Sequence, residues 1–85
     1  MRMAVRHRLS ATHQKTLGDN IRVRRQRLGL TQQQLAETVA VEPRVLQAIE
    51  YGTHGVSLAL FLSLAAVLKV SPMQLLKGVV PPKRS

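Results

Sequence analysis

Two side chains that can form paired hydrogen bonds stand one helical turn apart near the middle of the sequence, Arg44 and Gln47. An arginine can donate two parallel hydrogen bonds to O6 and N7 of guanine, and a glutamine amide can pair with N6 and N7 of adenine. The alternatives are a phosphate contact or a free surface position for Arg44, and a solvent-facing amide for Gln47. Arg44 is therefore the first candidate for reading a base, and Gln47 is the second.

Three neighbours share the outward surface predicted around these side chains: Glu42, Pro43 and Ala48. Pro43 has no backbone N–H, so it offers only apolar contact, for instance to a thymine methyl, and its first role is to set a helix start. The Glu42 carboxylate suits a helix N-terminus but repels phosphate, unless it accepts a hydrogen bond from a cytosine amino group. We count all three as candidate DNA-binding residues.

Catalysis has little support in the composition. The chain has four carboxylates and no cysteine, and it contains no glycine-rich phosphate loop or nucleophile elbow. Its three histidines, His7, His13 and His54, lack metal-ligand spacing. We expect a binding protein with no catalytic residue, no metal and no small-molecule cofactor.

The charge of the chain is strongly positive and concentrated in its first third. The formal net charge is +9. Most cations precede residue 28: Arg2, Arg6, Arg8, Lys15, Arg22, Arg24, Arg25 and Arg27. A basic field of this kind attracts nucleic acid through counterion release, although a charge run taken alone can equally be a solvated surface.

Start and stop signals divide the chain into short helices. Thr16 and Asp19 are spaced as a capping box, as are Thr31 and Gln34, while proline follows the expected cap at Pro43 and Pro72. Gly29, Gly52 and Gly78 mark helix ends. The predicted helices are 17–28, 32–39, 43–51, 58–68 and 72–77, which makes the chain all-α.

These helices define the expected domain organisation. Residues 1–15 are interpreted as a flexible basic arm, 16–78 as the folded domain and 79–85 as an extended tail. The arm could follow phosphates or enter the minor groove, or it could have no specific role. Its start lacks the apolar segment of a secretory signal, and the apolar run 58–68 is shorter than the roughly 20 residues of a membrane span. We expect a cytoplasmic, nucleoid-associated protein.

A longer pattern resembles a known family. The sequence Leu30-Thr31-Gln32-Gln33-Gln34-Leu35-Ala36, followed by Val41 and by Ile49-Glu50-Tyr51-Gly52, is similar to phage repressor and Cro-type (XRE-like) helix-turn-helix proteins. The resemblance runs from Leu17 to Leu76. It implies a five-helix lambda-repressor-like domain whose helix 43–51 enters the major groove of double-stranded DNA, and thus a transcriptional regulator, most simply a repressor.

The resemblance also assigns roles to single residues. Gln32 matches a position that binds a phosphate and braces the second helix of the motif, and Arg25 and Glu50 match two positions that form a structural bridge. Two residues depart from the family pattern. Glu42 stands where Ser or Thr is favoured, and Ala40 stands where Gly is usual, so a left-handed backbone there would be strained.

The helix 58–68 is more apolar than a core stripe requires. Leu58, Phe61, Ala65 and Leu68 suffice for packing. The face is widened by Ala59, Leu60, Leu62 and Val67. A homodimer through the fourth and fifth helices, with contributions from Met73, Leu76, Val79 and Val80, would cover the excess; the alternative is that the fifth helix and the tail pack back on the same chain.

Fold alone does not settle function, and a rival reading stays open. The same fold can serve as a protein-interaction module, such as an antitoxin-like or docking domain, with weak or no specific DNA binding. The net charge and Arg44 favour DNA.

Overall fold

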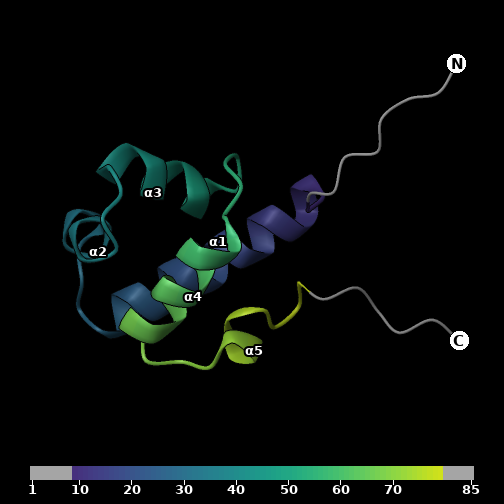
Figure 1. Ribbon diagram of the computed structural model, residues 1–85. Helices are drawn as coiled ribbons and strands as arrows, with labels where there is room; N and C mark the ends of the chain where they lie inside the picture. The colour runs from purple at the N-terminus through teal and green to yellow at the C-terminus, as the bar shows by residue number, and fades with distance from the viewer. Residues whose placement is uncertain (1–8, 80–85) are drawn as a thin grey trace, which may run out of the picture.

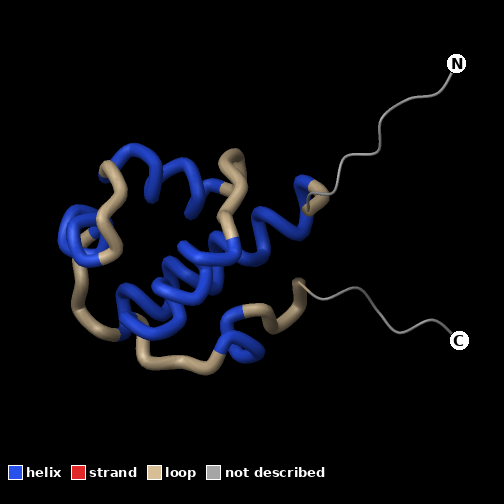
Figure 2. Tube along the Cα trace, viewed as in Figure 1, coloured by secondary structure: helices blue, strands red, loops and turns tan. Residues whose placement is uncertain are grey.

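The computed structural model describes residues 9–79. Within that range it contains five helices and no strand, as Figure 2 shows. The helices are α1 (Ala11–Arg27), α2 (Gln32–Thr38), α3 (Pro43–Tyr51), α4 (Leu58–Val67) and α5 (Pro72–Leu75). The predicted all-α, five-helix architecture is confirmed.

Helix α1 begins earlier than the sequence pattern predicted. Its N-cap is Ser10, whose side chain accepts a hydrogen bond from the His13 backbone N–H. Thr16, the predicted cap, lies inside the helix and donates from its hydroxyl to the Thr12 carbonyl. Residues 11–15, which we had assigned to the flexible arm, are therefore helical, because nothing between Ser10 and Gly29 stops the helix. The predicted arm residues 1–8 and tail residues 80–85 lie outside the described residues. Val79, predicted as the start of the extended tail and as a dimer contact, is instead buried in the core of the same chain.

The other helix starts agree with the local signals. Thr31 and Gln34 form a complete capping box, as do Ser71 and Gln74, and Ser57 caps α4. The C-terminal ends come slightly earlier than predicted, because Val39, Leu68 and Leu76 act as C-caps. Glu42 is the exception among the N-caps, since its side chain makes no capping hydrogen bond.

The core lies where all five helices meet. Figure 1 shows α1 passing through the middle of the molecule, with α3 on one side of it, α5 on the other and α4 drawn in front of it in this view. The buried apolar side chains are Leu17, Ile21, Leu35, Ala36, Leu46, Ile49, Phe61, Leu64, Ala65, Leu68, Leu75 and Val79.

One predicted core position on α4 is wrong. Leu58 is 71% exposed, and Leu64 is fully buried in its place. Successive residues turn by about 100° around a helix, so Leu64 and Leu58 lie about equally far from Phe61 on its two sides, and periodicity alone does not decide between them. Leu58 is the first residue of α4, where no neighbouring turn covers it.

Candidate nucleic-acid interface

Helices α2 and α3 are joined by a turn of four residues, 39–42. The turn is closed by backbone hydrogen bonds from Ala40 N to Glu37 O (3.2 Å) and from Val41 N to Ala36 O (2.9 Å). Figure 1 looks nearly down the axis of α2 while α3 lies across the view, so the two helices cross steeply. A short connection of this kind leaves the second helix projecting from the domain.

The turn requires a left-handed residue at Ala40. Its φ is 61°, a region that favours glycine because an L side chain crowds the backbone there. Ala40 therefore departs from the family pattern in residue type, but its backbone keeps the left-handed conformation. Lys69, in the turn between α4 and α5, adopts the same conformation with φ 60°, and no sequence signal had marked it.

The predicted DNA-binding candidates lie at the start of α3, on the side that faces away from the core. Pro43, Arg44 and Gln47 are exposed, and the Arg44 side chain keeps 84% of its surface accessible. Ala48 is half-buried at the edge of this side. The cationic and amide groups of Arg44 and Gln47 are thus available to another molecule.

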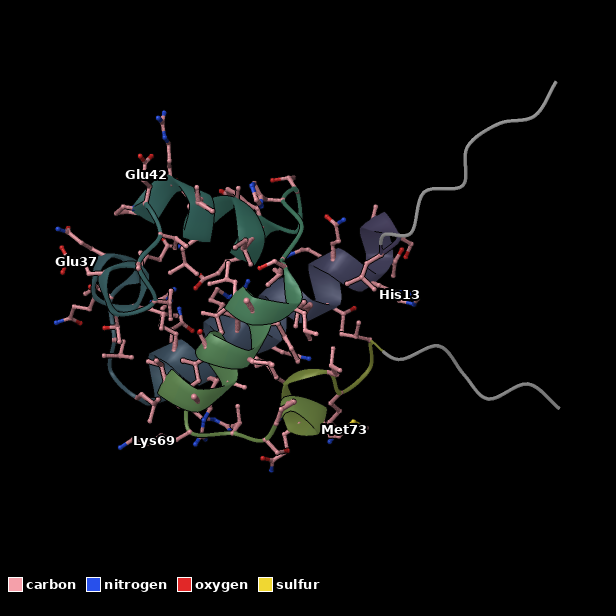
Figure 3. All side chains as sticks on the ribbon, in the orientation of Figure 1. His13, Glu37, Glu42, Lys69 and Met73 are labelled. Carbon is pink, nitrogen blue, oxygen red and sulfur yellow. The ribbon has the colours of Figure 1, made fainter. Side chains whose placement is uncertain are left out.

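Glu42 lies beside Arg44 at the start of α3. Its Oε1 is 3.2 Å from Arg44 Nε, and both side chains are largely exposed. In Figure 3, Glu42 lies at the outer edge of the molecule. An ion pair this exposed contributes at most about 1 kcal/mol, so it orients the guanidinium without locking it.

The opposite side of α3 is anchored by a buried ion pair. Arg25 of α1 donates from Nε to Glu50 Oε2 (2.7 Å) and from Nη2 to Glu50 Oε1 (2.9 Å). Arg25 Nη1 also donates to the Leu30 carbonyl (2.8 Å). Arg25 and Glu50 are both buried, so the pair joins α1, the loop before α2 and the end of α3 into one network.

Gln32 completes this network from the first residue of α2. Its side-chain amide donates to Glu50 Oε1 at 2.9 Å, which braces α3 against α2. A shallow hollow of about 210 Å³ opens beside it and is lined by Arg22, Gln32, Gln47, Glu50 and Tyr51. Arg22 was not among the predicted site residues, although its place three residues before Arg25 puts it on the same side of α1.

Sequence reasoning also missed Gly18, which sets how closely α1 approaches α3. A Cβ added there would overlap the carbonyl oxygens of Ile49 and Glu50, the second at 2.6 Å. The backbones of the two helices therefore touch at this point. Because contacts of this kind form only in the folded state, no local signal in the sequence could indicate them.

None of the described helices is long and apolar enough to cross a membrane. No group of three or more His, Asp or Glu side chains within residues 9–79 gathers where it could hold a metal ion.

The sequence was compared with known families and proteins. A family model described as a helix-turn-helix domain matches residues 16–76. The chain belongs to this helix-turn-helix family. A search of curated proteins finds no significant match.

Solved structures agree with this assignment. The restriction-modification controller protein C.AhdI from Aeromonas hydrophila is 30% identical with a TM-score of 0.72, over 75% of this chain and 97% of that one. The clp gene regulator ClgR from Corynebacterium glutamicum is 31% identical with a TM-score of 0.75, over 79% of this chain and 71% of that one. A hypothetical transcription factor from Neisseria shares the fold at 24% identity, with a TM-score of 0.72, over 87% of this chain and 84% of that one.

Family and neighbours together confirm the resemblance to the phage repressor and Cro type and the lambda-repressor-like fold. They also support the predicted function class: the helix-turn-helix protein is a DNA-binding transcriptional regulator.

Proposed function

We propose that this helix-turn-helix protein binds double-stranded DNA in a sequence-specific manner by laying α3 in the major groove. The observation that carries the proposal is the division of α3 into two sides. Leu46, Ile49 and Glu50 fix the helix from within, while Arg44 and Gln47 are exposed on the outside. A rigid helix with free hydrogen-bonding side chains near its start is the arrangement that direct readout requires.

Within this proposal Arg44 reads a guanine and Gln47 reads an adenine. Both side chains can form two hydrogen bonds to one base, and each such pair contributes about 1 to 3 kcal/mol of discrimination. Pro43 and Ala48 offer apolar contact to thymine methyl groups. The Glu42 carboxylate, 3.2 Å from Arg44, orients the guanidinium and favours a cytosine amino group at the adjacent position.

Backbone contacts position the helix on the duplex. Gln32 donates one amide hydrogen to Glu50 and retains another for a phosphate oxygen, so the same side chain can brace α3 and touch the backbone. Arg22, across the same hollow, adds a cation beside this amide. We assign both residues to phosphate binding.

The functional unit we propose is a homodimer formed through α4 and α5. Leu58, Leu62 and Met73 are 71%, 47% and 69% exposed, which is more apolar surface than these two helices need to leave uncovered. A two-fold axis there would place two α3 helices about 34 Å apart, to match successive major grooves and an inverted-repeat operator.

Repression is the simplest regulatory outcome, because a dimer seated on a promoter excludes other proteins from the same groove. A DNA partner places the protein in the cytoplasm, at the nucleoid. We assign it binding and no catalysis, in keeping with the function class of its family. The names of the controller and regulator neighbours are compatible with this role.

Selection of bound sequences from a random duplex library tests the proposal. We expect an enriched inverted repeat. Arg44→Ala should remove the preference at one base position in each half-site and weaken binding to the selected operator by about 10- to 100-fold. Arg27→Ala is the matched control. It also removes one positive charge, but from the side of α1 that faces away from α3, and it should keep the base preference.

Two results would contradict the proposal. Uniform weakening by Arg44→Ala, with every base preference retained, would mark Arg44 as a phosphate contact. Binding to random duplex that does not change with salt concentration would leave no role for counterion release and would favour the protein-interaction module instead.

A further inference from the structure

A second hollow lies on the side of α1 that faces away from α3. Its volume is about 420 Å³, and α1 and the region of α5 line it. Residues on a helix turn by about 100° each, so Asn20, Val23 and Arg27 lie opposite to Gly18 and Arg25, which contact α3. Figure 1 likewise shows α3 and α5 on opposite sides of α1.

The rim of this hollow is positively charged. Arg24, Arg27 and Lys77 line it, and no carboxylate of residues 9–79 does so. Arg24 is held in place, because it donates to the carbonyls of Leu68 (2.8 Å) and Lys69 (3.1 Å). Arg27 and Lys77 form no ion pair with any described residue.

The acidic side chains of the chain do not pair with the cations of this hollow. Asp19 binds Lys15 (2.9 Å) and Arg22 (2.8 Å), and these hydrogen bonds hold the pKa of Asp19 below its usual value. Glu50 is buried against Arg25. The remaining acids, Glu37 and Glu42, belong to α2 and to the start of α3, and neither lines the hollow. Neutralising this rim therefore takes another molecule.

The floor of the hollow is apolar and well fixed. Val23, Val70 and Leu75 contribute to it, and Val23 is 43% exposed. The Asn20 amide donates to the carbonyls of Leu75 (2.9 Å) and Lys77 (2.8 Å), which pins the α5 wall to α1. The hollow thus brings three apolar side chains together with three cations and the amides of Asn20 and Gln74.

We propose that this hollow docks an acidic segment of another protein, in which an apolar side chain is flanked by Asp or Glu. The apolar side chain would rest on Val23 and Val70, and the flanking carboxylates would pair with Arg27 and Lys77. A nucleic-acid backbone would satisfy the cations but would leave the apolar floor uncovered, so a peptide fits better. Because the hollow faces away from α3, the peptide and a duplex can bind together, and the domain can link DNA to an acidic protein.

The test measures binding of a fluorescein-labelled peptide in which leucines are flanked by Glu and Asp, to the full chain, by fluorescence anisotropy. A peptide with serine in place of leucine tests the apolar floor, and a peptide with Asn and Gln in place of the acids tests the rim. We expect both changes to weaken binding clearly. The double variant Arg27→Gln/Lys77→Gln should bind the leucine peptide about tenfold more weakly.

Arg44→Glu is the matched control, because it lowers the net charge by two, as Arg27→Gln/Lys77→Gln does. This control should keep peptide affinity within about twofold and weaken duplex binding. Arg27→Gln/Lys77→Gln should weaken peptide binding and keep duplex affinity within about twofold. Melting curves establish that each variant is folded. Peptide binding is measured without DNA, so failure of this inference leaves the proposal for α3 intact, and failure of that proposal leaves this inference intact.

Three outcomes would overturn the inference. Equal loss of peptide binding in both variants would mean that net charge alone attracts the peptide. Equal binding of the leucine and serine peptides would leave the apolar floor without a role. Displacement of the peptide by a duplex, with NMR shifts of the Val23 and Val70 methyl groups on adding duplex alone, would show that the hollow takes nucleic acid.

Discussion

Glu50 illustrates how a single carboxylate holds the DNA-binding helix in place. It accepts hydrogen bonds from Arg25 and from Gln32 and is buried with 3% of its surface exposed. Glu50→Ala would leave the buried Arg25 guanidinium without its counter-charge, which costs about 3 to 5 kcal/mol. We expect a clearly lower melting temperature, measured by circular dichroism.

Two further variants separate this effect from a general loss of charge. Glu37→Ala removes an exposed acid from α2 and should change the melting temperature little. Replacing Arg25 and Glu50 together by apolar residues should be milder than Glu50→Ala, because neither charge is stranded. An unchanged melting curve for Glu50→Ala would refute the bridge.

Ala40 carries strain that one substitution can remove. Its φ of 61° is readily adopted by glycine but disfavours any side chain. We expect Ala40→Gly to raise the free energy of unfolding by up to about 1 kcal/mol, measured by urea denaturation. Ala66→Gly is the control, because Ala66 is an exposed residue inside α4 where glycine is unfavourable. This substitution should lower the free energy of unfolding by about 0.5 to 1 kcal/mol. If both substitutions lower it, the left-handed turn is not a source of strain.

The interactions that could be predicted from the sequence join residues that are close together along the chain. The caps Thr31, Ser57 and Ser71 involve groups only three residues apart, so the sequence contains both partners. The hydrogen bond from Gln32 to Glu50, the place of Arg22 and the left-handed Lys69 depend on how distant segments meet. The bracing role of Gln32 came only from the family resemblance, the helical spacing from Arg25 was the one pointer to Arg22, and no signal marked Lys69.

At the scale of elements, the contact between α1 and α3 sets the frame of the domain. Gly18 allows the two backbones to touch, and any side chain there would have to push α3 outward. We expect Gly18→Ala to destabilise the fold by about 1 to 3 kcal/mol, as overpacking does, with a matching fall in the midpoint of urea unfolding.

Gly55 provides the control for this substitution. It lies in the loop before α4, with no atom within 4 Å of an added Cβ, so Gly55→Ala should leave the midpoint nearly unchanged. A Gly18→Ala variant as stable as Gly55→Ala would show that α1 and α3 do not touch as described.

Helix boundaries were predictable where a local signal marks them, as Thr31 marks the start of α2 and Pro43 and Gly52 mark the two ends of α3. The start of α1 was not, because Thr16 and Asp19 imitate a capping box inside a longer helix that Ser10 begins. On α4 nearly every residue is apolar, so the hydrophobic pattern has no preferred side. The choice between Leu58 and Leu64 as core was consequently decided by tertiary packing alone.

For the whole molecule, the proposed homodimer makes the oligomeric state the decisive measurement. Leu58→Ser/Leu62→Ser removes two of the three exposed apolar side chains that we assign to the dimer, the third being Met73. We expect sedimentation velocity to report a monomer for this variant and a dimer for the parent chain. Its binding to an inverted repeat should fall, and its binding to a single half-site should persist.

A variant that keeps Leu58 and Leu62 is the control for this double substitution. Tyr51→Ser lowers exposed apolar area at the end of α3, where Tyr51 is 67% exposed, and should remain dimeric. A parent chain that sediments as a monomer at the concentrations used for DNA binding would rule out the dimer, and with it the inverted repeat.

The free outer side of α3 has a consequence for how such a protein can change over generations. Arg44 and Gln47 support no part of the core, and the frame beneath them rests on Gly18, Arg25 and Glu50. Mutations at the outer positions can therefore accumulate without a folding penalty, and a duplicated copy of the gene could acquire a new target while its scaffold is inherited unchanged. The same separation makes these positions a natural starting point for directed evolution of altered operators.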